Sequence, residues 1–212
     1  MDPQSQLAIA FAVGLAVGLL IRRYRKHRFQ NRGEVVLSQA VKRRFSPPDY
    51  FLLNHLTIPI VGGTTQIDHV LVSRYGVFVI ETKDYSGWIF GGAEQRQWTQ
   101  VLYRVRHRFQ NPLRQNFGHL QAIRSLLDFL PAEAVTSAVV FTGDADFKTS
   151  PPRGVFTIEQ FLSHVSNQTS EVMSLNRLQF CVGRLETVRA EVSKRTDIEH
   201  VAYLRRRHAR ED

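Results

Sequence analysis

Cysteine is almost absent from this 212-residue chain, which contains Cys181 and no other. A single thiol excludes a disulfide within the chain and any zinc site built from several cysteines. The lack of disulfides fits a reducing compartment. Cys181 follows Phe180 and precedes Val182, so we expect a small buried hydrophobe rather than a reactive thiol.

Acidic residues are missing from a strongly basic segment near the N-terminus. Its six positive side chains are Arg22, Arg23, Arg25, Lys26, Arg28 and Arg32. The chain has a formal net charge of +9, and most of that charge lies in this one segment. The total charge is therefore weak support for nucleic-acid binding.

Polar side chains are missing from residues 7–21, which read LAIAFAVGLAVGLLI. As a helix this run covers roughly 22 Å, and the flanking arginine stems extend its reach toward the ~30 Å hydrocarbon core. A cleaved signal peptide would carry positive charge before the run, whereas here the basic segment follows it. We expect a single-pass helix in the cell membrane with the folded domain in the cytoplasm. A helix lying in the membrane interface, or a core helix, is the alternative.

Gly14 and Gly18 have the spacing that lets two membrane helices pack closely. A homodimer through these glycines is a hypothesis only, because the same spacing arises by chance in segments rich in alanine, glycine and leucine.

The rest of the chain alternates between helical and extended patterns. We expect helices over residues 33–44, 111–130, 159–165 and 174–195, strands over 50–60, 65–72, 77–83, 135–141 and 155–158, and an irregular hairpin over 87–98. The helix at 111–130 should bury Phe117, Leu120, Ile123, Leu127 and Leu130. This order predicts an α/β fold with a mixed central β-sheet flanked by helices. Three parts follow: a membrane anchor and basic flank (1–28), a folded domain (29–166), and a C-terminal helix with a basic tail (167–212).

The hairpin over residues 65–83 has a register that can be predicted. With a turn of two or four residues, Val72 pairs with Val77, and Asp68 and Glu81 are equally far from that pair. Asp68 then faces Glu81 across the hairpin, and Lys83 lies on the same face as Glu81. A three- or five-residue loop would shift this register.

Two carboxylates that face each other destabilise a sheet unless positive charge lies nearby. Lys83 supplies part of that charge, and a divalent cation such as Mg²⁺ prefers carboxylate oxygens with several retained waters. An ordinary salt bridge at exposed strand ends is the other interpretation, and composition alone does not decide between them.

These segments resemble the NERD (nuclease-related) domain, a branch of the PD-(D/E)xK nuclease-like superfamily. The likeness covers about residues 33–145 and depends on Gly33-Glu34, TQIDHVLV at 65–72, YGVFVIETK at 75–83, Gly87, Trp98 and NPLRQ at 111–115. It implies a restriction-endonuclease-like core and a membrane-anchored enzyme that hydrolyses phosphodiester bonds in nucleic acid, DNA first among them. A non-catalytic module that binds nucleic acid or protein at the membrane is the alternative.

The resemblance also implies roles for individual residues. Asp68 and Glu81 would ligate Mg²⁺ or Mn²⁺, with the main-chain carbonyl of Thr82 as a further ligand and Glu34 as an additional acidic residue at the metal. Lys83 would be the catalytic lysine. Gln115 would contribute a polar group to the catalytic site.

Other candidate groups have a structural interpretation that is as good or better. His69 should point away from Asp68 and serve the core. Asp144 and Asp146 suit a solvated turn better than a second cation site.

The aromatic and basic residues after Lys83 each have two possible interpretations. Trp88 and Trp98 either stack on bases or close a core. Arg104, Arg106 and Arg108 alternate, so on a strand they would form either a phosphate-contacting stripe or a solvated edge. The basic tail at 205–207 is expected to be a frayed end.

Overall fold

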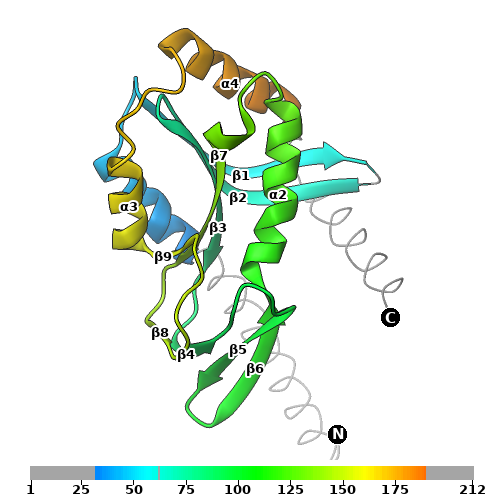
Figure 1. Cartoon of the computed structure of the whole chain (residues 1–212), viewed down its shortest axis with the longest axis vertical. Coiled ribbons are helices and arrows are strands. Elements are labelled where there is room, and N and C mark those ends of the chain that lie inside the picture. The colour runs from blue at the N-terminus through cyan, green and yellow to red at the C-terminus, as the bar shows by residue number, and fades with distance from the viewer. Residues whose placement is uncertain (1–31, 62, 190–212) are drawn as a thin grey trace, which may run out of the picture.

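The computed structural model describes residues 32–61 and 63–189 (Figure 1). The predicted membrane helix, the Gly14 and Gly18 pair, most of the basic segment and the tail at 205–207 lie outside these residues. Within the described ranges, no helix is long and apolar enough to cross a membrane.

The larger of two β-sheets has the strand order β1-β2-β3-β7-β9. Its strands are β1 (Tyr50–Ile60), β2 (Gly63–Ser73), β3 (Gly76–Lys83), β7 (Val135–Phe141) and β9 (Val155–Thr157). The first three strands run antiparallel, and β7 and β9 extend the sheet in parallel pairing from β3. This places β3 in the middle of the sheet, where six consecutive residues from Gly76 to Glu81 are buried.

A smaller sheet has the order β6-β5-β4-β8 and lies beyond the carboxyl end of β3 (Figure 1). Its strands are β4 (Gly87–Phe90), β5 (Gln97–Leu102), β6 (Val105–Gln110) and β8 (Ala145–Phe147). Gly91 is needed at the turn after β4, because a Cβ there would lie 2.2 Å from the Trp98 ring. The mixed α/β prediction is confirmed, but the described residues form two mixed sheets, and the expected irregular hairpin at 87–98 is part of the second.

Helices cover both faces of the larger sheet (Figure 1). They are the first described helix (residues 32–44), α2 (Pro112–Leu126), α3 (Ile158–Ser166) and α4 (Leu175–Val188). One face packs against α2 and α4 through residues such as Ile123 and Leu178. The other packs against the first helix and α3 through residues such as Val41 and Phe161.

The apolar face of α2 differs from the prediction in one residue. Phe117 is 59% exposed, while Asn116 and His119 are buried beside Leu120 and Ile123. The prediction of a buried Phe117 is wrong because it followed apolar residues alone, and this helix turns two polar side chains toward the sheet. The helix also ends at Leu126, before the expected residue 130.

Candidate active site

Glu81 and Lys83 lie on one side of the end of β3. Lys83 Nζ donates a hydrogen bond to Glu81 Oε1 over 2.6 Å, and the two side chains are 15% and 4% exposed. Strand alternation predicted this common side. The pair is therefore largely shielded from water, where its Coulomb attraction is stronger than at the surface.

The predicted hairpin register is confirmed from Ser73–Gly76 to His69–Ile80. The next step would pair Asp68 with Glu81, but here the side chain of Asp68 replaces the backbone pairing. Asp68 Oδ2 accepts the backbone N–H of Thr82 at 2.8 Å. This bond fixes the Asp68 carboxylate beside the end of β3.

The strands β1 and β2 lose their regular alternation at this position. Ile67 and Val70 are three positions apart, yet both pack into the cluster beneath α2 and α4, as do Leu53 and Leu56. His55 lies at the centre of this change, between Asn54 and Leu56, which are both paired with β2. Its φ is +52°. A non-glycine residue in this region is uncommon, and such outliers gather at functional sites.

Glu34 approaches from the first described helix. Its Oε2 lies 3.0 Å from His55 Nδ1, and its charge is close enough to Asp68 to raise the pKa of that residue. Gly33 allows the approach, because a Cβ there would lie 2.4 Å from Thr142 Oγ1 and 2.7 Å from Asp84 Cβ. Glu34 therefore lies near the site as predicted, but its carboxylate is paired with His55.

Two side chains of α2 complete the site. Gln115 Oε1 accepts a hydrogen bond from Lys83 Nζ at 3.1 Å. One helical turn later, His119 Nε2 lies 3.5 Å from Glu81 Oε2, while its Nδ1 contacts Thr65 Oγ1 at 2.8 Å. The first distance makes the His119–Glu81 contact electrostatic rather than a formed hydrogen bond. His119 and His55 were not predicted, although the four-residue spacing of Gln115 and His119 places them on one helix face.

The pKa values of the three central residues, Asp68, Glu81 and Lys83, are shifted by burial and by the charges around them. Burial, together with the negative charges of Glu81 and Glu34, raises the pKa of Asp68 well above its usual value. Burial alone would raise the pKa of Glu81, but Lys83 and His119 outweigh it and lower that pKa. Burial would lower the pKa of Lys83, yet Glu81 outweighs it and the pKa is raised. The site thus contains a formed Lys83–Glu81 ion pair and a carboxyl at Asp68 whose ionisation is disfavoured without further positive charge.

Comparison with known proteins identifies the family of this chain. Residues 30–142 match the family model for NERD, described as the nuclease-related domain. The chain belongs to the nuclease-related domain family. An uncharacterized protein of Bacillus anthracis is 44% identical over 94 residues, which are 42% of this chain and 44% of that relative. The match thus spans less than half of the relative's length, and no solved structure matches the chain at a significant level.

The matched part of this NERD domain contains every candidate site residue, from Glu34 on the first described helix to His119 on α2. The remaining described elements, β8, β9, α3 and α4, lie beyond residue 142. They extend the two sheets and cover the larger one, so they support the site without supplying side chains to it.

The donor atoms of the NERD site fit one kind of metal. Among the described residues, no group of three or more His, Cys, Asp or Glu side chains is arranged to hold an ion alone. Two carboxylates are available, and the buried Glu81 Oε2 has no hydrogen-bond partner. Mg²⁺ is commonly held by one or two carboxylates while it keeps several waters. The site therefore fits a hydrated, hard divalent cation and does not fit a cage made of protein side chains alone.

The other histidine and acidic candidates have structural roles. His69 is 1% exposed, and its Nδ1 contacts Asn54 Oδ1 at 2.7 Å. Burial lowers the pKa of His69 to about 3, as expected for a neutral core histidine. Asp146 pairs with Lys148 at the surface. Cys181 is fully buried, and burial raises its pKa to about 11, which keeps the thiol protonated and inert.

The aromatic and basic candidates divide between core and surface. Trp98 is 1% exposed and stacks on Phe141, whereas Trp88 is 50% exposed. Arg104 lies in the turn between β5 and β6, so only Arg106 and Arg108 alternate within a strand. The three arginines therefore do not form one strand stripe.

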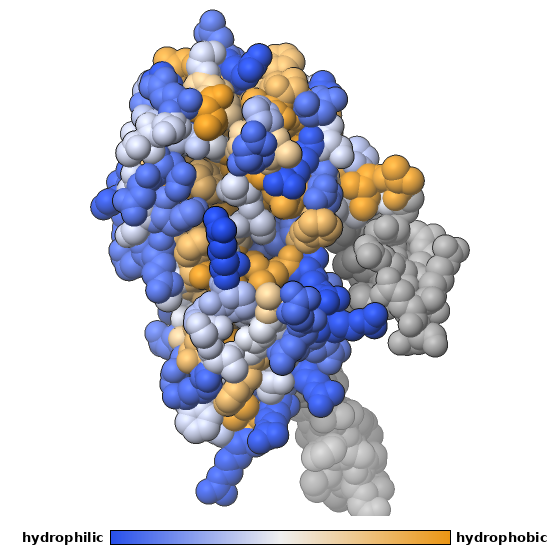
Figure 2. All heavy atoms as spheres, in the orientation of Figure 1, coloured by the Kyte–Doolittle hydropathy of each residue, from blue (hydrophilic) through white to orange (hydrophobic). Residues whose placement is uncertain are grey.

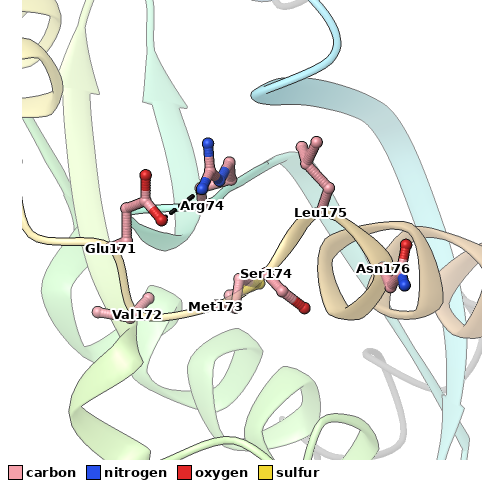
Figure 3. Close-up of a pocket in the computed structure, with 7 residues that line it drawn as sticks. All are labelled: Arg74, Glu171, Val172, Met173, Ser174, Leu175 and Asn176. Carbon is pink, nitrogen blue, oxygen red and sulfur yellow. Dashed lines mark hydrogen bonds and ion pairs between the residues drawn. The ribbon is translucent and has the colours of Figure 1, made fainter.

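A surface pocket is lined by Arg74 and by residues 171–176 (Figure 3). Arg74 precedes β3, so the pocket lies at the opposite end of that strand from Lys83. Arg74 in the β2–β3 turn pairs with Glu171 and Asp49, and its carbonyl accepts the backbone N–H groups of Val172 and Met173. These bonds attach the segment before α4 to the hairpin. The pocket contains none of the candidate catalytic side chains.

Proposed function

We propose that this protein hydrolyses phosphodiester bonds in nucleic acid, DNA first among them, with Mg²⁺ or Mn²⁺. The observation that carries the proposal is the largely shielded Lys83 ammonium, held by Glu81 at 2.6 Å and Gln115 at 3.1 Å. It lies beside Asp68, whose carboxyl is fixed to Thr82 at the end of the same strand. Membership of the nuclease-related family makes phosphodiester chemistry the first choice for such a site.

Each residue of the site has a defined part in this proposal. Asp68 and Glu81 would hold the cation, with the Thr82 carbonyl as a further oxygen donor. Glu34, which is paired with His55, would be an additional acidic residue near the cation rather than a third carboxylate ligand. The bound cation would lower the pKa of a water molecule and stabilise charge on the phosphate.

Lys83 and Gln115 would serve the phosphate rather than the cation. The raised pKa of Lys83 keeps its side chain positively charged, so it would stabilise negative charge and would not act as a general base. Gln115 would orient the ammonium.

The proposal is tested by incubating the wild-type chain with mixed DNA and RNA substrates. Cleavage is expected with Mg²⁺ or Mn²⁺ and should stop when EDTA is added. If nucleic acid binds with a steep salt dependence but is not cut with any of several divalent metals, the chain is a binding module. If it neither binds nor cuts, the ionisable cluster is structural.

The Asp68→Asn variant tests the cation site without an activity assay. Asn keeps an acceptor for the Thr82 N–H and removes a carboxylate that lies near Glu81 and Glu34. We expect the metal-free variant to be more stable than wild type at pH 8 by about 1 kcal/mol, measured by urea unfolding. Because the folded-state pKa of Asp68 is raised, wild type loses stability as pH rises above the unfolded-state value, so this difference should grow with pH.

A divalent cation should reverse the order of stability. At ten to 100 times its Kd, Mg²⁺ or Mn²⁺ should stabilise wild type by between about 1.4 and 2.7 kcal/mol and leave Asp68→Asn unchanged. Equal stabilisation of both proteins would exclude Asp68 as a ligand.

We also propose that residues 7–21 anchor the domain to the cytoplasmic side of the cell membrane. The support is the uncharged apolar run followed by the basic segment. The chain should remain in the membrane pellet after alkaline extraction. Leu15→Arg should release it, since a central arginine costs about 2.5–3.5 kcal/mol on insertion scales. Leu15→Ala is the matched control and should stay in the pellet, whereas release of the wild type would refute the anchor.

A further inference from the structure

The smaller sheet has one face that the core does not cover. Strand pairing sets two cross-strand rows on this outer face, and the rows are Trp88–Val101–Arg106 and Phe90–Thr99–Arg108. The row between them, Ile89–Gln100–His107, points to the opposite, inner face. Each outer row thus places an aromatic ring and an arginine two strands apart.

Exposure separates the two faces at β4 and β5. On the inner face, Ile89 is 0% exposed and packs with Trp98 against Phe141 of the larger sheet. On the outer face, Trp88 is 50% exposed and Phe90 is 36% exposed. The outer aromatic rings therefore do not close a core, which was the structural alternative for Trp88.

Positive charge surrounds these rings. Residues 87–110 contain Arg96, Arg104, Arg106 and Arg108 but one acid, Glu94. In the described part of the chain, neither Arg106 nor Arg108 has an ion-pair or hydrogen-bond partner. Lys148 lies over the Trp88 ring at 5.2 Å and pairs with Asp146. Figure 2 shows a mixed surface of white, blue and a few orange atoms at this lower end of the molecule.

We propose that this outer face binds a single-stranded segment of nucleic acid. Its bases would stack on Trp88 and Phe90, and its phosphates would contact Arg106 and Arg108. The choice of nucleic acid as the ligand rests on the proposed function. The choice of a single strand follows from the flat aromatic rings, since the bases of a duplex already stack on one another and expose only their edges.

The position of the sheet suits a strand that also reaches the site. β4 begins shortly after Lys83 at the end of β3, and Asn111 connects the β4–β5 loop to the start of α2, which carries Gln115. The Lys148 ammonium over Trp88 is at an exposed position, where cation–π contacts are weak. A base can therefore displace it and leave Lys148 to face a phosphate.

The test is fluorescence anisotropy with the full chain in mild detergent and EDTA, so that no metal-dependent cleavage occurs. The probes are a labelled 20-nucleotide oligo(dT), the same strand as a duplex with oligo(dA), and vesicles containing phosphatidylserine. Trp88→Ala with Phe90→Ala should weaken oligo(dT) binding at least about tenfold. Arg106→Gln with Arg108→Gln should lower the slope of log K against log salt by about 1.4.

Matched control variants remove the same side-chain types elsewhere. Phe180 is 57% exposed and Arg177 is exposed, both on α4. Phe180→Ala and Arg177→Gln should leave oligo(dT) affinity within about twofold, an effect of surface substitution alone. Circular dichroism melting of every variant checks that the fold is kept.

The outcomes separate this inference from the proposed function. If wild type cleaves nucleic acid with Mg²⁺ but the face variants bind oligo(dT) as wild type does, the surface is refuted and the activity stands. If the face variants lose oligo(dT) binding while no protein cleaves, the surface stands and the activity fails. Equal loss of duplex binding, or loss confined to vesicle binding, overturns the single-strand assignment.

Discussion

Replacing Lys83 with methionine is expected to lower metal-dependent cleavage of nucleic acid by at least about 100-fold. The side chain is a largely shielded ammonium whose raised pKa keeps it charged beside Asp68 and Glu81. Methionine fills a similar volume without the charge. Initial rates at saturating substrate measure the effect.

The stability of this variant must be measured with its activity. Glu81 loses its 2.6 Å partner while it stays buried, and breaking such a pair typically costs about 3–5 kcal/mol. Assays should therefore be run well below the melting temperature, with oligonucleotide binding in EDTA as evidence of folded protein. Lys42→Met, on the exposed side of the first helix, is the matched control and should retain full activity.

Gln115→Ala provides the second arm of a double-mutant cycle. Gln115 accepts from Lys83 and acts through it, so we expect a loss of about tenfold. The double variant should be no worse than Lys83→Met alone, because the orienting group has nothing left to orient. Cleavage by folded Lys83→Met within tenfold of wild type would remove Lys83 from the mechanism.

Asn111→Ala is expected to lower the free energy of unfolding by about 3–4 kcal/mol. Asn111 is fully buried, and its Oδ1 accepts the backbone N–H of Leu113 at the start of α2. Its amide group also donates to the carbonyls of Gly92, Ala93 and Gln95. Removing the side chain leaves the N-terminal end of α2 without its cap and takes a donor from the carbonyls of Ala93 and Gln95, while the Gly92 carbonyl keeps its bond from Trp98 Nε1. Urea unfolding followed by circular dichroism measures the change.

Two comparisons separate the parts of this effect. Asn111→Ser keeps an oxygen that can cap α2 but loses the amide donors, so about 1 kcal/mol should be recovered. Ser174→Ala removes a cap from α4 whose side chain accepts the Arg177 N–H, and should cost about 1 kcal/mol. Equal losses for Asn111→Ala and Ser174→Ala would show that Asn111 is a simple cap.

The site was predictable where it depends on local geometry. A tight turn at Ser73–Gly76 sets the pairing of β2 and β3, and alternation then brings Lys83 and Glu81 together. The position of Asp68 was only partly predictable. The backbone pairing stops before Asp68, and its side chain binds the Thr82 N–H instead. Strand alternation cannot predict that a side chain accepts the backbone N–H in place of a paired residue.

By itself, the sequence determined the pairing register of the hairpin, the common side of Glu81 and Lys83, and the family pattern. Each of these depends on neighbouring residues or short spacings. Only the tertiary structure decided that His119 reaches Glu81, that Glu34 pairs with His55, and that Trp88 is exposed while Trp98 is buried. These contacts join elements far apart in the chain. They follow from how α2, the first helix and the smaller sheet pack, which no local pattern encodes.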